Sequence, residues 1–142
     1  MSAIKTFIDT NVLIYAFTTD DPTKQETALQ ALENCSPVIS TQIVKELSNV
    51  MLRKTSIDLQ TIQEIISEII DVAEVANEEI RLIFAAFDIC KRYKLSFYDS
   101  LVVATAINSK CQMLFSEDMQ DGQTIDDKLK IVNPFKSYDD TK

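Results

Sequence analysis

The chain has 142 residues, no histidine, a single glycine and a formal net charge of −8 at pH 7. This length favours one domain with a sizeable core, and a hydrophobic fraction of 46% is that of an ordinary globular protein. The lack of histidine excludes Ser-His-Asp and Cys-His catalysis, and the single glycine excludes the Gly-rich loops that cradle nucleotide phosphates. The negative charge argues against nucleic-acid binding over a wide surface, but it allows a small site in which a bound metal supplies the positive charge.

Nothing in the sequence predicts export or membrane insertion. No apolar run is long enough to span a bilayer, and the N-terminus lacks a basic segment followed by an apolar signal core. The three cysteines, Cys35, Cys90 and Cys111, are odd in number and lie among apolar residues. We interpret them as buried, reduced thiols of a cytoplasmic protein in preference to a disulfide or a metal site.

Strands and helices alternate along the predicted chain. The segment from Ile4 to Ile8 is apolar, β-branched and aromatic, which is typical of a buried strand. Asp21-Pro22 supplies an N-cap and a first-turn proline for a helix that runs to about Asn34. Further strands are predicted at 37–40, 72–76, 112–115 and 130–132, and further helices begin after Ser40 or Thr41, after Asp58, after Asn77 and after Ser96.

This alternation is typical of right-handed βαβ units. It predicts an α/β fold in three layers, an α/β/α sandwich with a central parallel sheet and a Rossmann-like topology. One domain is expected to span residues 1–135, and residues 136–142 are expected to form a polar, flexible tail.

Four carboxylates are the candidate site, because each lies among apolar residues. Asp9 follows the first strand, Asp118 lies just past the strand at 112–115, Glu46 lies in the first or second turn of a helix, and Asp99 lies in the first turn of another. Buried carboxylates are costly unless cations or metals pair with them, and few basic residues lie next to these acids. We therefore expect a hard divalent cation with oxygen ligands.

The predicted fold also brings these acids toward one another. Ligands of open parallel sheets bind at the carboxyl ends of the strands, so the four acids are expected to converge on one edge of the sheet. Taken singly, each acid has an ordinary alternative as a turn residue, a helix N-terminal residue or a helix-surface residue.

Several neighbours of these acids have two interpretations each. Asn11 and Ser116 lie two residues from Asp9 and Asp118, where they would either orient a carboxylate or hold metal-bound water, or else serve turn chemistry. Tyr98 would stack on a base or ribose, although buried packing is the favoured interpretation. The basic stretch 91–94 would contact phosphate, although a solvated helix C-terminus favoured by the dipole is preferred.

Four motifs follow one another in a fixed order. They are D-T-N after the first strand, S-T-Q-x-x-x-E, S-F-Y-D-S-L-V-V-A-T-A and L-F-S-E-D-M-Q-D-G. Over the span from about Ile4 to Phe135, this ordered set resembles the PIN-domain ribonucleases, and most closely the VapC-type toxins of bacterial toxin–antitoxin pairs.

The resemblance implies a site, a cofactor and partners. It implies a PIN-like α/β/α fold with one acidic pocket that binds Mg²⁺ or Mn²⁺. The family's metal-ligating, catalytic acids match Asp9, Glu46, Asp99 and Asp118, and its polar helpers match Asn11 and Ser116. It also implies an RNA substrate, an antitoxin protein partner and a homodimer; RNA in preference to DNA comes only from the resemblance.

The chemistry is coherent on the residues alone. Cleavage of a phosphodiester needs an activated water, neutralisation of charge on the phosphoryl oxygens and help for the leaving oxygen, and a metal supplies all three where histidine is absent. Two alternatives stay open. A haloacid-dehalogenase-like phosphatase would use Asp9 as nucleophile, but the second acid of its first motif would fall on Asn11. A catalytically silent PIN-like binding or scaffold module would keep the fold without the activity.

Overall fold

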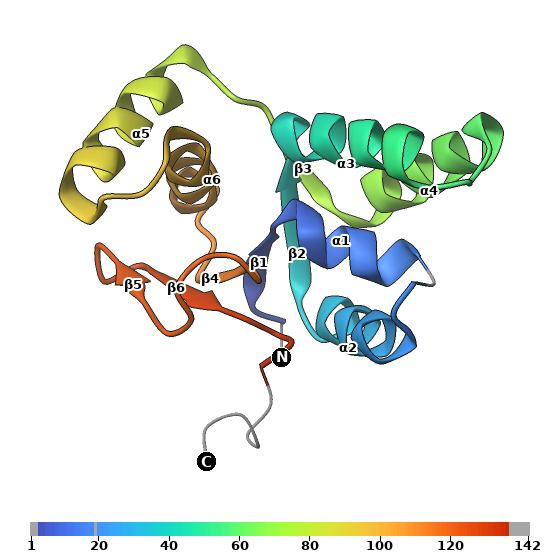
Figure 1. The fold of residues 1–142 in the computed structure, drawn as a ribbon. Coiled ribbons are helices and arrows are strands. Elements are labelled where there is room, and N and C mark those ends of the chain that lie inside the picture. The colour runs from blue at the N-terminus through green and yellow to red at the C-terminus, as the bar shows by residue number, and fades with distance from the viewer. Residues whose placement is uncertain (1–2, 19, 137–142) are drawn as a thin grey trace.

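Within residues 3–18 and 20–136, which the computed structural model describes, one six-stranded sheet is flanked by six helices (Figure 1). The elements are β1 (Lys5–Ile8), α1 (Thr10–Phe17), α2 (Pro22–Glu33), β2 (Ser36–Ser40), α3 (Thr41–Lys54), α4 (Leu59–Val72), β3 (Glu74–Ala76), α5 (Ile80–Tyr93), α6 (Phe97–Asn108), β4 (Met113–Phe115), β5 (Thr124–Ile125) and β6 (Leu129–Val132).

The sheet has the strand order β3-β2-β1-β4-β6-β5. The first five strands of this order pair in parallel, with Phe7 of β1 opposite Val38 of β2 and Ile8 opposite Phe115 of β4. Only β5 pairs antiparallel within the described sheet, as the short partner of β6. The predicted α/β fold with a central parallel sheet is therefore confirmed, with one short antiparallel strand added at an edge.

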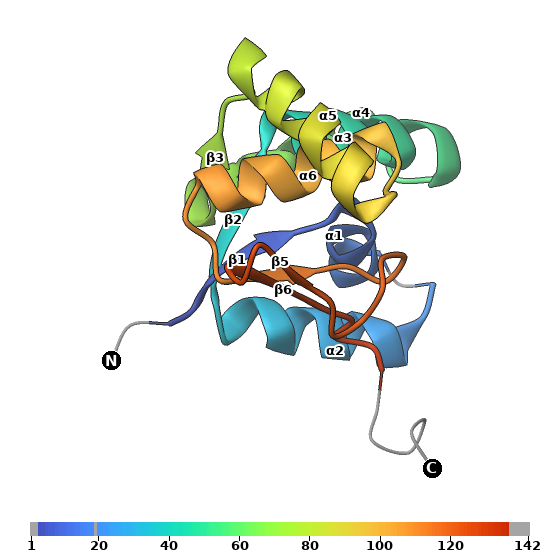
Figure 2. The same ribbon diagram turned by 90° about the vertical axis from the view of Figure 1, so that its left-hand side faces the viewer.

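Helices lie on both sides of this sheet. Figure 2 shows α2 on one side of the strands and α5 and α6 on the other. The strands contribute fully buried side chains such as Phe7, Val38, Leu114 and Ile131 to the core, and α3 adds Met51. Because helices cover both faces of the sheet, side chains on both sides of the parallel strands are buried, and such burial favours strand sequences that are largely apolar. The parallel arrangement also places the carboxyl ends of β1, β2, β3 and β4 on the same side of the molecule.

Most helix starts agree with the predictions. The side chains of Asp21, Ser40, Asp58 and Ser96 each accept a hydrogen bond from a backbone N–H in the first turn of the helix that follows. The helix predicted after Asn77 is different, because α5 begins at Ile80 with Glu79 at its N-cap and no side-chain cap hydrogen bond.

Three further differences concern short elements, and one prediction is not tested. Helix α1 was not predicted at all, and neither was the two-residue strand β5. The strand predicted at 72–76 is confined to Glu74–Ala76. The tail predicted at 136–142 lies outside the described residues except for Lys136, so the division into a domain and a tail stays a prediction.

The prediction of buried, reduced thiols holds for two of the three cysteines. All three cysteines are free; Cys35 and Cys111 are buried, and Cys90 is half-buried. Within the described residues, no helix combines the length and the apolar character needed to cross a membrane.

Candidate active site: an acidic pocket

The four predicted acids line one pocket of about 200 Å³ at the carboxyl ends of the parallel strands. Asp9 lies between β1 and α1, Glu46 lies on α3, Asp99 on α6 and Asp118 just beyond β4. The same pocket is also lined by Thr10, Asn11, Gln42, Val50, Tyr98 and Val102. Asp9, Glu46 and Asp99 are half-buried, whereas Asp118 is exposed, so the expectation of four buried acids holds only in part.

Asp9 has both a structural and an electrostatic role. Its Oδ1 accepts a hydrogen bond from the backbone N–H of Thr10 at 2.8 Å, which caps α1, and its Oδ2 accepts one from the Ser116 hydroxyl at 2.9 Å. Burial raises the pKa of Asp9 above its usual 3.8; these two hydrogen bonds oppose the rise, and the nearby charges of Asp99 and Glu46 add to it. Asp9 is therefore an acid whose negative charge is poorly compensated by the protein.

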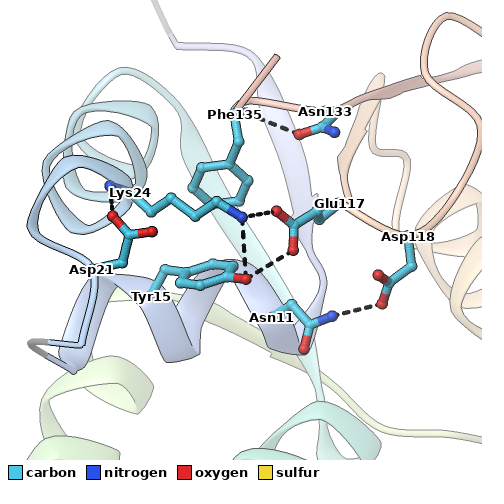
Figure 3. Close-up of polar contacts among 8 residues, drawn as sticks. All are labelled: Asn11, Tyr15, Asp21, Lys24, Glu117, Asp118, Asn133 and Phe135. Atoms are coloured by element: carbon cyan, nitrogen blue, oxygen red, sulfur yellow. Dashed lines mark hydrogen bonds and ion pairs between the residues drawn. The ribbon is translucent and has the colours of Figure 1, made fainter.

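Asn11 and Ser116 orient carboxylates. The amide Nδ2 of Asn11 donates to Oδ2 of Asp118 at 2.6 Å (Figure 3). The Ser116 hydroxyl is fully buried, donates to Asp9 and accepts a hydrogen bond from the backbone N–H of Met119 at 3.3 Å. Ser116 therefore takes part in the local turn as well, so both interpretations of this residue apply.

Glu46 is held by Thr10 and Gln42, which belong to the motifs D-T-N and S-T-Q-x-x-x-E but were given no role there. Its Oε2 accepts a hydrogen bond from the Thr10 hydroxyl at 2.8 Å, and its Oε1 accepts one from the Gln42 side-chain amide at 2.7 Å. Gln42 lies four residues before Glu46 on the same helix, and this i, i+4 spacing was the signal available in the sequence. Thr10 offered no such signal, because its contact depends on how α1 meets α3.

Asp99 enters the pocket from the first turn of α6. The Ser96 hydroxyl accepts a hydrogen bond from the backbone N–H of Asp99 at 3.2 Å, which fixes the start of this helix. The adjacent Tyr98 lines the pocket and is 64% exposed, so the favoured interpretation of buried packing was wrong. The basic stretch 91–94 forms the solvated C-terminus of α5, as preferred, and Arg92 pairs there with Asp126.

The pocket suits a hard divalent cation by the chemistry of its donors. Carboxylate oxygens dominate the lining, and the side-chain carbonyl oxygen of Gln42 is buried without a hydrogen-bond partner. Within residues 3–18 and 20–136, no three acidic or cysteine side chains are already gathered closely enough to hold an ion. Separate hydrogen-bond donors hold Asp9, Glu46 and Asp118, so a cation would have to draw the carboxylates together.

Comparison with solved structures finds the same fold in bacterial toxins. A toxin–antitoxin complex from Klebsiella pneumoniae has a TM-score of 0.71 and 20% identity, covering 93% of this chain and 99% of the other. VapC20 of Mycobacterium tuberculosis, a sarcin-ricin loop cleaving toxin, has a TM-score of 0.65 and 17% identity, covering 80% and 91%. DNA-bound VapBC of Salmonella typhimurium has a TM-score of 0.63 and 16% identity, covering 90% and 96%. No curated protein sequence matches the chain significantly.

Sequence comparison at the level of families gives a direct assignment. The family model described as PIN domain matches residues 6–120, a span that runs from β1 past β4 and includes all four acids of the pocket. The match covers most of the chain, and it agrees with the motifs and with the observed fold. The chain belongs to the PIN domain family.

Proposed function

We propose that this protein is a metal-dependent endoribonuclease that hydrolyses RNA phosphodiester bonds with Mg²⁺ or Mn²⁺, and that it is the toxin of a toxin–antitoxin pair. The observation that carries the proposal is that Asp9, Glu46, Asp99 and Asp118 line one pocket of a PIN domain. The chain contains no histidine that would serve as a base, so oxygen ligands and a cation are the chemistry that this pocket favours.

The roles of the residues follow from their contacts. The four acids would hold the cation, which when bound would lower the pKa of a water molecule, stabilise charge on the phosphoryl oxygens and orient the reacting groups. Ser116 keeps the Asp9 carboxylate in place, Asn11 does the same for Asp118, and Thr10 and Gln42 do so for Glu46. Tyr98 presents an exposed ring beside the acids, on which a base of single-stranded RNA can stack.

Cleavage of RNA tests this function directly. The purified protein is expected to cut RNA with Mg²⁺ or Mn²⁺ and to stop when EDTA is added. Asp99→Asn is expected to lower the rate at least roughly 100-fold, because losses on that scale already follow from changing groups that only support metal ligands. The matched control is Asp71→Asn, which removes an exposed acid on α4 outside the pocket and is expected to keep the wild-type rate.

The alternatives give different results in the same experiment. A protein that binds RNA but never cuts it would be a silent scaffold. Hydrolysis of a small phosphomonoester in place of RNA would favour the phosphatase. If Asp99→Asn cuts RNA as fast as the wild type does, the assignment of the pocket is wrong.

Partners and location belong to the same proposal. The similar structure from Klebsiella is a toxin–antitoxin complex, and that from Salmonella is a DNA-bound VapBC; both support an antitoxin partner for this chain. A small reading frame for a DNA-binding antitoxin directly upstream of the gene would support that partner. A homodimer is proposed because two-fold dimers are the commonest oligomers, and light scattering that shows only a monomer at tens of micromolar would contradict it. The cytoplasm is the proposed location, which the free cysteines support.

A further inference from the structure

A cluster of four side chains outside the acidic pocket joins α1, α2, the segment after β4 and the segment after β6. These residues are Tyr15, Lys24, Glu117 and Phe135, called here the Lys24 cluster (Figure 3). The Lys24 ammonium forms an ion pair with Glu117 and donates to the Tyr15 hydroxyl at 3.2 Å, and that hydroxyl donates to Glu117 Oε1 at 3.0 Å. Each of the three polar groups therefore contacts the other two.

Aromatic rings complete the cluster. The Lys24 ammonium lies 4.5 Å from the centre of the Tyr15 ring and 5.3 Å from that of Phe135. The two rings pack edge to face with their centres 5.0 Å apart. Cation–π contacts and ring packing add to the ion pair and favour one position of the Lys24 side chain.

The cluster is directly connected to the candidate active site. Ser116, Glu117 and Asp118 are consecutive, and each forms a side-chain hydrogen bond with α1 or its N-cap. Ser116 bonds to Asp9, Glu117 to Tyr15, and Asp118 to Asn11. Asn11 and Tyr15 are four residues apart and therefore lie on the same face of α1.

We propose that Lys24 and Glu117 are positioning residues for the acidic pocket: they fix the segment 116–118 against α1 and thereby hold Asp118 and Ser116 in place. This inference rests on the proposed function. The ion pair with Lys24 keeps the Glu117 carboxylate in the cluster and beside α1. The contacts of Lys24 with Glu117 and with Tyr15 occupy its ammonium, so a role as a phosphate contact is not needed to explain it.

Two variants separate this role from general stability. Lys24→Met removes the ammonium and keeps an unbranched apolar stem, and Glu117→Gln keeps the shape and removes the charge. We expect each to weaken Mn²⁺ binding and to lower kcat by about tenfold, at the low end of the effect of groups that support metal ligands, with KM for an RNA oligonucleotide changed by less than about twofold. Calorimetric titration with Mn²⁺ measures the affinity without any cleavage.

Three further variants sharpen the result. Lys24→Arg keeps the charge and is expected to restore most of the affinity. The double variant Lys24→Met/Glu117→Gln is expected to bind Mn²⁺ as weakly as the single variant with the lower affinity, and no more weakly, because both changes remove the same ion pair. The matched control is Lys5→Met. Lys5 forms an ion pair with Glu74 at 3.2 Å, and its side chain is 33% exposed, as that of Lys24 is. Lys5 is the first residue of β1, whereas the pocket lies beyond the last residue of this strand. This control should leave Mn²⁺ binding unchanged.

The contrary outcomes are distinct. Lower melting temperatures with unchanged Mn²⁺ affinity and kcat would show that the cluster only stabilises the fold. A raised KM with unchanged Mn²⁺ affinity would make Lys24 an RNA contact. Either outcome overturns the inference while the proposed function stands, whereas a wild-type protein that neither binds Mn²⁺ nor cuts RNA would overturn both.

Discussion

At the scale of single residues, the acids of the pocket are held by neutral donors. Thr10, Asn11, Gln42 and Ser116 supply the side-chain hydrogen bonds to Asp9, Glu46 and Asp118. Such donors fix the direction of a carboxylate without cancelling its charge. The raised pKa of Asp9, caused mainly by burial and also by the charges of Asp99 and Glu46, is the electrostatic result. The folded, metal-free protein therefore carries an unfavourable concentration of negative charge.

The substitution Asp99→Asn tests whether this negative charge destabilises the metal-free protein. Without metal, the variant should melt at or above the wild-type temperature, because one of the charges that repel Asp9 is gone. With Mn²⁺, its melting temperature should rise less than that of the wild type. For the wild type the gain follows mass action, about 2.7 kcal/mol when free metal is a hundred times its dissociation constant. Thermal melts of both proteins in EDTA and in Mn²⁺ measure the four temperatures.

Two results would count against this expectation. Equal shifts with Mn²⁺ in the two proteins would mean that Asp99 does not take part in metal binding. A large drop in the metal-free melting temperature would mean that Asp99 has a structural role that outweighs the repulsion.

Some residues in and around this pocket were predictable from the sequence, and others were not. The acids could be predicted because each follows a strand or lies in the first or second turn of a helix, and the strand order brings those positions together. Lys24 and Glu117 could not, since they are 93 positions apart and either one alone is an ordinary surface charge. Tyr98 is predicted to be buried because aromatic residues among apolar neighbours usually pack in the core. Its position beside an open pocket leaves it exposed instead.

At the scale of elements, α1 shows where periodicity fails as a signal. It has eight residues and is apolar along most of its length, so its sequence has no alternation of 3.6 residues that would distinguish a helix from a strand. Helices α3 and α4 were predicted because a side-chain cap precedes an amphipathic stretch in each. The start of α5 was misplaced because Asn77 suggested a cap, whereas the helix begins at Ile80.

The hairpin of β5 and β6 is attached to the end of α5 by one acid. The guanidinium of Arg92 donates to both carboxylate oxygens of Asp126, the Tyr93 hydroxyl donates to Asp126 at 2.9 Å, and the Asp126 backbone N–H donates to that hydroxyl at 3.0 Å. The hydrogen bonds from Arg92 hold the pKa of Asp126 below its usual 3.8, with a smaller contribution from Tyr93.

Asp126→Asn is expected to lower the melting temperature at pH 7 by roughly 2 °C, since partly exposed ion pairs contribute little. The difference from the wild type should shrink as the pH falls below about 4. The reason is that the unfolded chain, with the higher pKa, takes up the proton first, so the stability that the charged Asp126 contributes is lost on acidification. Thermal melts of the two proteins at a series of pH values measure the difference.

Asp127→Asn is the matched control for this hairpin. Asp127 is the next residue, is exposed and has the same backbone φ of 54° as Asp126, a left-handed conformation that asparagine adopts readily. Its substitution should leave the melting temperature unchanged at every pH. A difference for Asp126→Asn that persists undiminished at low pH would show that charge is not what attaches the hairpin.

At the scale of the whole molecule, the net charge of −8 limits how RNA is bound. A protein that holds RNA through many Lys and Arg contacts with phosphates loses affinity steeply as salt rises. Here the positive charge is expected to come mainly from the bound cation, so few counterions are released. We expect KM for RNA to rise by about tenfold or less between roughly 50 and 200 mM monovalent salt at fixed Mn²⁺.

The salt series has a clear contrary result. A rise in KM of about a thousandfold over the same range would indicate roughly six or more phosphate contacts. That many contacts would require a basic surface extending well beyond the acidic pocket. A neutral monovalent salt that does not bind Mn²⁺ keeps the free metal concentration constant across the series.

The two ends of the sheet have a consequence for association. The outermost strands are β3, with three residues, and β5, with two, so each edge exposes only a short row of unpaired backbone groups. Long, flat edges are templates on which further strands add, and short edges are one of the ways in which natural sheets avoid this kind of aggregation. A second copy of the chain would therefore join through helices, and its sheet would not continue across the contact.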